Sequence, residues 1–171
     1  MIHQFTLERY NLQPTTQQPV YKLTVDLAQQ EVIWQGREHV QTRGRVVAEL
    51  NKVQLTTLQQ MLEELKPDAL EKAYESQLPL TTYEVLTFTD SLGQTKEVQN
   101  AYGQYCANTE ALEQTLAKVP PAQQTALSRL LTFTFKLDQL MHTHQLIGQI
   151  TGSQSENVAQ SADGSSTTEL T

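Results

Sequence analysis

The sequence has few of the residues that support cross-linking or catalysis. It has a single cysteine, Cys106, so no disulfide can form within the chain and the core must be stable without one. Charged residues make up only 18% of the 171 residues and aromatic residues only 6%. No apolar run approaches the roughly 18 residues of a membrane span, and the N-terminus lacks the pattern of a signal peptide. We therefore expect a cytoplasmic protein with no membrane span.

Motifs for cofactor binding or catalysis are also missing. The sequence contains no phosphate-binding loop, no Gly-rich nucleotide fingerprint, no nucleophile elbow and no His-Glu-x-x-His motif. His142 and His144 are two residues apart, so on a helix they would point about 200° apart and could not bind one metal ion together. We expect no catalytic residue, no metal and no cofactor. An enzyme that uses Cys106 or His144 is a remote alternative.

Charge is distributed unevenly along the chain. The net charge is −7, and the excess of acidic residues falls after residue 52. Such a chain repels phosphate backbones, so we expect no nucleic-acid partner. Arg43 and Arg45 are two residues apart and would share one face of a strand. They are either a solvated, charged strand edge or a docking patch for an acidic partner.

Alternating apolar and polar residues predict strands in the first third of the chain. The clearest case is the second of four predicted strands, where every second residue from Tyr21 to Leu27 is apolar. The segment "LTTLQQMLEEL" then changes to helical spacing, with Asn51, Thr56 or Thr57 as possible N-caps and Pro67 after its end. A predicted hairpin, "YEVLTFTDSLGQTKEV", follows. Short connections favour antiparallel pairing of the strands.

A long amphipathic helix is predicted near the C-terminus, over residues 120–150. Its apolar seam repeats at intervals of four and three residues: Ala126, Leu130, Phe133, Leu137, Leu140, His144 and Ile147. Thirty helical residues would span about 45 Å, whereas a six-residue strand covers about 20 Å. An unbroken helix would therefore overhang the sheet and need a partner to cover it. The alternative is a broken or bent helix that packs on its own sheet.

These patterns predict an α+β fold with an antiparallel sheet of about five or six strands, helices on one face and a long C-terminal helix. We expect three segments along the chain. Residues 1–118 form the sheet domain and residues 119–150 the long helix. Residues 151–171, rich in Ser, Gly and Thr, form a polar tail that is disordered in the absence of a partner.

Residues 5 to about 117 resemble a small bacterial α+β domain family of unknown function. Its pattern is Pro-x-Tyr followed by Gly-x-Val-x-Tyr-x-Gly, and the matching segments are "LER" with Arg9, "PVY" at 19–21, "EVIWQG" at 31–36, and Gly44. The loop cysteines usual in the family are absent from "NLQPTTQQP", and Gln30 and Glu31 replace a customary glycine. The resemblance implies the fold but no activity.

We interpret the chain as a non-catalytic accessory or interaction protein that docks a partner subunit, or its own copy, through the C-terminal helix. The predicted partner-binding residues are Leu130, Phe133, Leu137, Leu140, Ile147, Arg43 and Arg45. The alternative is a small-ligand binding domain with an aromatic-lined pocket near Trp34, Tyr102 and Tyr105.

Overall fold

The computed structural model describes residues 1–11, 19–37, 40–75, 82–102 and 109–147. Cys106, Tyr105 and the predicted tail lie outside these ranges. The elements in chain order are β1 (Ile2–Asn11), β2 (Tyr21–Asp26), β3 (Glu31–Gly36), β4 (Gly44–Glu49), α1 (Lys52–Leu65), the 3-10 turn η1 (Pro67–Ala69), β5 (Ala73–Tyr74), β6 (Thr82–Asp90), β7 (Thr95–Asn100), α2 (Thr109–Leu116), α3 (Pro121–Met141) and α4 (Thr143–Ile147).

Within the described residues, seven strands form one sheet in the order β4-β3-β2-β1-β6-β7-β5. Every pairing is antiparallel except that between β5 and β7, which is parallel. The predicted α+β class and the C-terminal helix are confirmed. The sheet gains one strand over the prediction because β5 has only two residues, too few to show a period in the sequence.

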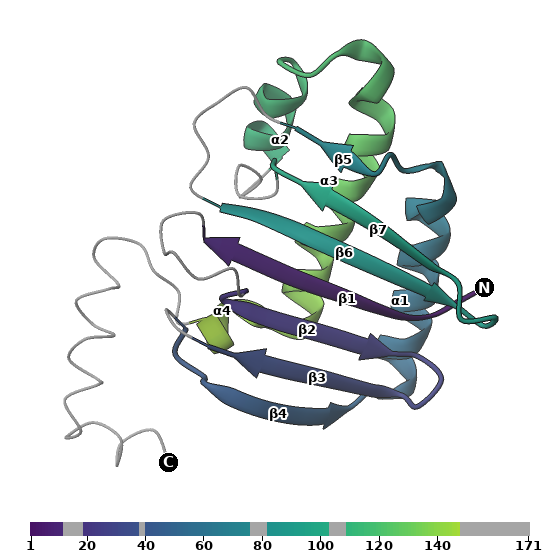
Figure 1. Ribbon diagram of the computed structural model, residues 1–171, viewed down its shortest axis with the longest axis vertical. Helices are drawn as coiled ribbons and strands as arrows, with labels where there is room; N and C mark the ends of the chain where they lie inside the picture. The colour runs from purple at the N-terminus through teal and green to yellow at the C-terminus, as the bar shows by residue number, and fades with distance from the viewer. Residues whose placement is uncertain (12–18, 38–39, 76–81, 103–108, 148–171) are drawn as a thin grey trace.

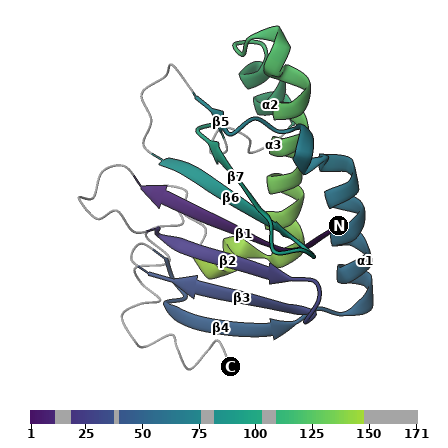
Figure 2. The ribbon, with the colours of Figure 1, turned by 45° about the vertical axis from the view of Figure 1, so that its right-hand side comes forward.

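The hydrophobic core lies between the sheet and the two helices α1 and α3. Figures 1 and 2 show both helices on the same side of the sheet. The period-two pattern of the strands aims Phe5, Leu7 and Leu23 at these helices, and all three are buried. Phe133 of α3 contacts Phe5 edge-to-face at 5.5 Å between ring centroids. No helix of the described residues lies on the opposite face of the sheet, which we call the bare face.

Local hydrogen bonds fix both ends of α1. The Asn51 side chain accepts a bond from the Gln54 N–H, and the Gln54 side chain accepts one from the Asn51 N–H. This reciprocal pair is a capping box, which satisfies two otherwise free donors at the helix start. At the other end, Lys66 takes a left-handed conformation and its N–H donates to the Leu62 carbonyl. Asn51 is therefore the cap among the three predicted candidates.

The predicted C-terminal helix is not continuous, because it is interrupted at His142. α3 runs from Pro121 to Met141, and His142 then takes a left-handed conformation with φ of 53°. The chain resumes as α4, where the Leu146 and Ile147 carbonyls accept bonds from the Thr42 and Gln41 N–H groups. The helix is therefore broken within the described residues, as the bent alternative predicted.

Candidate functional site

A cluster of charged side chains lies at one end of the sheet, centred on Arg9. β1 places Arg9 on the core face, beside Tyr21 of β2 and Glu84 of β6. The guanidinium donates from Nε to Glu84 at 3.0 Å and from Nη1 to the Tyr21 hydroxyl. Two further bonds, of 3.1 and 2.8 Å, form a fork to the Asp138 carboxylate of α3. One arginine therefore ties three strands to the main helix.

Further polar groups saturate the two carboxylates of the cluster. Asn100 donates to the second oxygen of Glu84 at 2.7 Å, and the Thr143 hydroxyl donates to Asp138 at 2.7 Å. All four carboxylate oxygens thus accept a hydrogen bond. Among the described residues, no buried side-chain nitrogen or oxygen lacks a partner. An arrangement so fully paired fixes the positions of β1, β2, β6 and α3 relative to one another.

Burial and neighbouring charges both shift pKa values in this cluster. The Arg9 side chain is 25% exposed and that of Glu84 only 2%. Burial alone would lower the pKa of Arg9, but Tyr21, Asp138 and Glu84 raise it well above its usual value, so the guanidinium stays charged. Burial, together with the nearby carboxylates, raises the pKa of Tyr21. Tyr21 therefore remains protonated and accepts from Arg9 as a neutral phenol.

The described residues of the predicted aromatic pocket belong to the core. Trp34 is buried, stacks on Tyr21 with 4.5 Å between ring centroids, and donates from Nε1 to the Thr42 carbonyl at 2.8 Å. Tyr102 is buried, and its hydroxyl donates to the Glu75 carbonyl at 2.7 Å. Both polar groups are satisfied within the chain. Tyr105 lies outside the described residues.

The predicted helical ridge divides into an enclosed part and a partly exposed part. Leu130, Phe133 and Leu137 are buried against the sheet of the same chain. Leu140 and Ile147 are partly buried and pack at the margin of that core. The first three side chains therefore present no surface to a partner.

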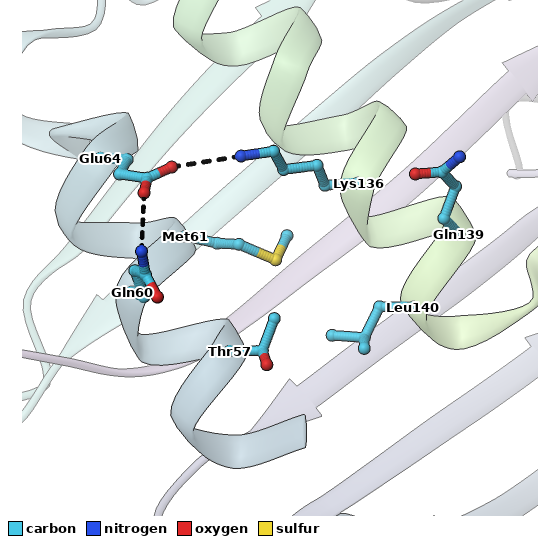
Figure 3. A pocket seen from close by; sticks show the side chains of 7 residues that line it. All are labelled: Thr57, Gln60, Met61, Glu64, Lys136, Gln139 and Leu140. Atoms are coloured by element: carbon cyan, nitrogen blue, oxygen red, sulfur yellow. Dashed lines mark hydrogen bonds and ion pairs between the residues drawn. The ribbon is translucent and has the colours of Figure 1, made fainter. Parts of the chain in front are cut away.

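Leu140 lines an open groove of about 400 Å³ between α1 and α3. Figure 3 shows Met61 and Leu140 facing each other across the groove, with an ion pair above them. Lys136 contacts Glu64 at 3.3 Å, and Gln60 donates to the same carboxylate at 3.1 Å. These bonds from Lys136 and Gln60 lower the pKa of Glu64. The charged groups at the rim are thus paired with each other.

The strand β4 differs from every other strand because all six of its residues are exposed. Val46 is 41% exposed and Val47 43%, which is unusual for large apolar side chains in a sheet. Arg45 and Glu49 carry opposite charges and have no ion pair in the described part of the chain. Arg43 lies just before the strand and is also exposed. Two of the predicted docking residues therefore lie at this edge.

Alternation of hydrogen bonds identifies which backbone groups of β4 point away from the sheet. The Leu50 N–H donates to the Gln30 carbonyl at 2.7 Å, so this pair is a hydrogen-bonded pair of the ladder with β3. Such pairs alternate with non-bonded ones along an antiparallel ladder. The backbone groups of Arg45, Val47 and Glu49 therefore point outward, and no described strand pairs with them.

Two chemical features are absent from the described residues. No group of three or more His, Cys, Asp or Glu side chains there could hold a metal ion. None of the helices described there combines the length and the apolar character that a membrane span requires. The side chain of His144 lies outside the description, while His142 caps α3.

Sequence reasoning missed most of the Arg9 cluster. Arg9 entered only through the family resemblance, and Glu84, Asn100 and Asp138 were not singled out. A signal was present in strand parity, since Glu84 shares its face with Leu86 and Phe88. An acidic residue at a core-facing position indicates a buried counter-ion.

These features define the chain as an α+β domain with one helix-covered sheet face, an internal charge cluster and one exposed edge strand. The family model of a domain of unknown function, DUF6438, matches residues 17–120. The chain belongs to this family. The match covers the sheet from β2 to β7 together with α1 and α2, and β1 and α3 lie outside it. No curated protein matches the sequence.

Proposed function

We propose that this protein is a non-catalytic interaction domain that binds an extended protein segment along β4. The observation that carries the proposal is the exposed edge of β4, with the outward backbone groups of Arg45, Val47 and Glu49. An incoming strand would pair with these groups and extend the sheet, a mode known as β-augmentation. Cytoplasmic location and a bacterial source accompany this proposal as predictions from the sequence.

Most of the features that protect edge strands from pairing are absent from β4, which supports a binding role for this edge. Edge strands commonly resist pairing through a proline, a bulge, a very short length or charged side chains. β4 has the last of these, but its charges are of both signs and can also attract a complementary strand. β4 has six residues, contains no proline, and pairs with β3 in one continuous register. The opposite edge, β5, has only two residues. A long regular edge with exposed valines favours association.

The side chains of β4 define what an incoming antiparallel strand should carry. Arg45, Val47 and Glu49 share one face of the strand, at successive alternate positions. Electrostatic and apolar complementarity favours an acidic residue opposite Arg45, an apolar residue opposite Val47 and a basic residue opposite Glu49. Written from its own N-terminus, the segment reads base-x-apolar-x-acid. This pattern describes the expected partner in more detail than the acidic partner predicted from the sequence.

The proposal moves docking from the C-terminal helix to the sheet edge. Leu130, Phe133 and Leu137 are enclosed by their own chain, so their substitution would change folding before it changed association. Arg45 and Val47 are exposed, so their substitution leaves the core intact. The two locations are therefore separable by mutation.

A peptide titration tests the edge directly. A fluorescent peptide with the base-x-apolar-x-acid pattern should bind the full chain, and Val47→Pro should weaken binding at least about tenfold because it removes the outward N–H. Edge strands tolerate proline where the N–H faces solvent, so the fold should persist.

The matched control is Val47→Ala, which keeps the backbone donor and loses only side-chain contact. It should reduce binding less than Val47→Pro does. Equal binding by the wild type and by Val47→Pro would show that β4 is not the docking element. Circular dichroism and thermal unfolding of each variant establish that it is folded.

A further inference from the structure

We infer that the segment bound by β4 is β4 of a second copy, so that two sheets join edge to edge across a twofold axis at Val47. This inference rests on the proposed function and names its partner. It is motivated by the sequence of the strand, because β4 itself carries the base-x-apolar-x-acid pattern that its edge requires. In its own direction it reads Arg45, Val46, Val47, Ala48, Glu49.

The backbone permits this pairing without any shift in register. Arg45, Val47 and Glu49 expose their N–H and carbonyl groups on the same outer side. An antiparallel partner centred on Val47 sets Val47 opposite its own copy and Arg45 opposite Glu49 of the second copy. Twofold symmetry then creates the reciprocal contact, so both copies use one identical surface.

Charge on the bare face of the sheet is arranged in two rows that match under this symmetry. The register aligns Lys22, Gln35 and Arg45 across β2, β3 and β4. It aligns Asp26, Glu31 and Glu49 in the same way. The twofold axis brings the basic row of one copy into line with the acidic row of the other.

The acidic row is unfavourable in a single chain. Glu49 lies directly opposite Glu31, and like charges at facing positions of a sheet destabilise it. Arg45 cannot form an ion pair with Glu49 of its own chain, because the two residues are four positions apart on the strand, a separation of about 13 Å. Arg45 of the second copy would lie on the free side of Glu49 and pair with it.

Apolar contacts complete the interface on both faces of the joined sheet. On the bare face, Val47 lies opposite Ile33 of β3 on one side. On its other side it would meet Val47 of the second copy. On the helix side, Val46 would face Ala48 of the second copy. The two valines that are more than 40% exposed in the single chain would then be covered.

The interface is a pair of six-residue strands, below the size of a standard permanent interface, so association should depend on concentration. Sedimentation equilibrium from about 1 to about 300 μM should therefore show the mass rising from 19.3 kDa toward twice that value. Amide hydrogen exchange at Arg45, Val47 and Glu49 should slow over the same range.

Charge reversal tests the register. R45E and E49R should each weaken self-association at least tenfold, because each brings like charges together at two symmetric contacts. An equimolar mixture of R45E and E49R should form a heterodimer, since one chain supplies only acids and the other only bases. The double variant R45E/E49R should return to within about threefold of the wild type. R43E makes the same charge change outside the strand and is the matched control.

The outcomes separate this inference from the proposed function. A wild-type chain that stays monomeric yet binds the peptide overturns the second copy and leaves the edge as a docking site for another protein. A dimer insensitive to both single reversals places self-association elsewhere and overturns the inference. Failure of both self-association and peptide binding overturns the two proposals together. Rescue in the mixture and in the double variant supports the inference.

Discussion

The Arg9 cluster and the β4 edge use the same chemical groups in opposite ways. In the cluster, one arginine meets two carboxylates of its own chain, and every carboxylate oxygen has a donor. At the edge, Arg45 and Glu49 are exposed and have no ion pair in the described part of the chain. A charge satisfied within the chain fixes the fold, whereas complementary charges that cannot reach each other are available to a second molecule.

The position of each strand in the sheet explains the difference. β1 lies between β2 and β6, and α3 packs across its core face, so Arg9 has neighbours on three sides. β4 has a neighbouring strand on one side only. An arginine therefore stabilises the fold at the centre of the sheet, whereas at the margin we propose that it contacts a second molecule.

The largest effect should come from removing the central arginine. Arg9→Met leaves Glu84 and Asp138 without their counter-ion, and breaking a buried pair in this way costs about 3–5 kcal/mol. We expect a loss of about 3 kcal/mol in the free energy of unfolding, at the lower end because Asp138 is 28% exposed.

Urea unfolding at a protein concentration that keeps the chain monomeric measures this loss. Arg45→Met is the matched control and should change the free energy of unfolding by less than about 0.5 kcal/mol. Similar losses in the two variants would remove the distinction between an internal and an external arginine.

A second, smaller effect should arise where the two regions are joined. Arg9 contacts Tyr21, Tyr21 stacks on Trp34, and Trp34 donates to the Thr42 carbonyl just before β4. Gly36 lies beneath this last bond, and a Cβ there would overlap the Thr42 oxygen and lie 2.7 Å from Trp34 Nε1.

Gly36→Ala should therefore displace the start of β4 and cost about 1–3 kcal/mol in unfolding free energy. It should also weaken self-association. Gly44→Ala is the control, because its Cβ would meet nothing within 4 Å and only its φ of 82° is unfavourable. That backbone cost is about 1–2 kcal/mol. If Gly36→Ala unfolds no more easily than Gly44→Ala, the close approach at Thr42 is unimportant.

Much of the fold was predictable because it depends on local periodicity. Alternation in β2 and the hairpin of β6 and β7, and helical spacing in α1, are strong signals within single segments. The end of α3 at Met141 was not predictable in this way. His142 adopts a left-handed conformation while α4 bonds to residues 41 and 42, and sequence periodicity contains no information about such distant contacts.

The candidate site was only partly predictable for the same reason. Arg43 and Arg45 were identified as a possible patch from their spacing alone. The self-complementary character of β4 requires the register with β3, which determines that Arg45, Val47 and Glu49 point their backbone groups outward. Likewise, Asp138 reaches Arg9 across 129 positions of sequence, a pairing that no local pattern encodes.

The smallest effect should come from Tyr10, which lies beside Arg9 in sequence but on the bare face of the sheet. Its ring stacks on Tyr83 with 4.8 Å between centroids, and its hydroxyl donates to Glu8 at 3.1 Å. Burial and the neighbouring Glu8 raise the pKa of Tyr10 to about 12. The folded chain therefore holds this proton more tightly than the unfolded chain, whose tyrosines ionise near pH 10.

The sign of the pH dependence follows from this difference in proton binding. Below pH 10 both states carry the proton and the stabilisation is fully present. As the pH rises from 10 through 12, the unfolded chain releases its proton first and the free energy of unfolding falls.

Tyr10→Phe should lack this part of the decline, so the difference in unfolding free energy between wild type and variant should shrink as the pH rises toward 12. Tyr83→Phe keeps the Tyr10 hydroxyl and its bond to Glu8, so it should retain most of this decline. Parallel curves for the wild type and Tyr10→Phe would show that the hydroxyl of Tyr10 titrates alike in the folded and unfolded chains.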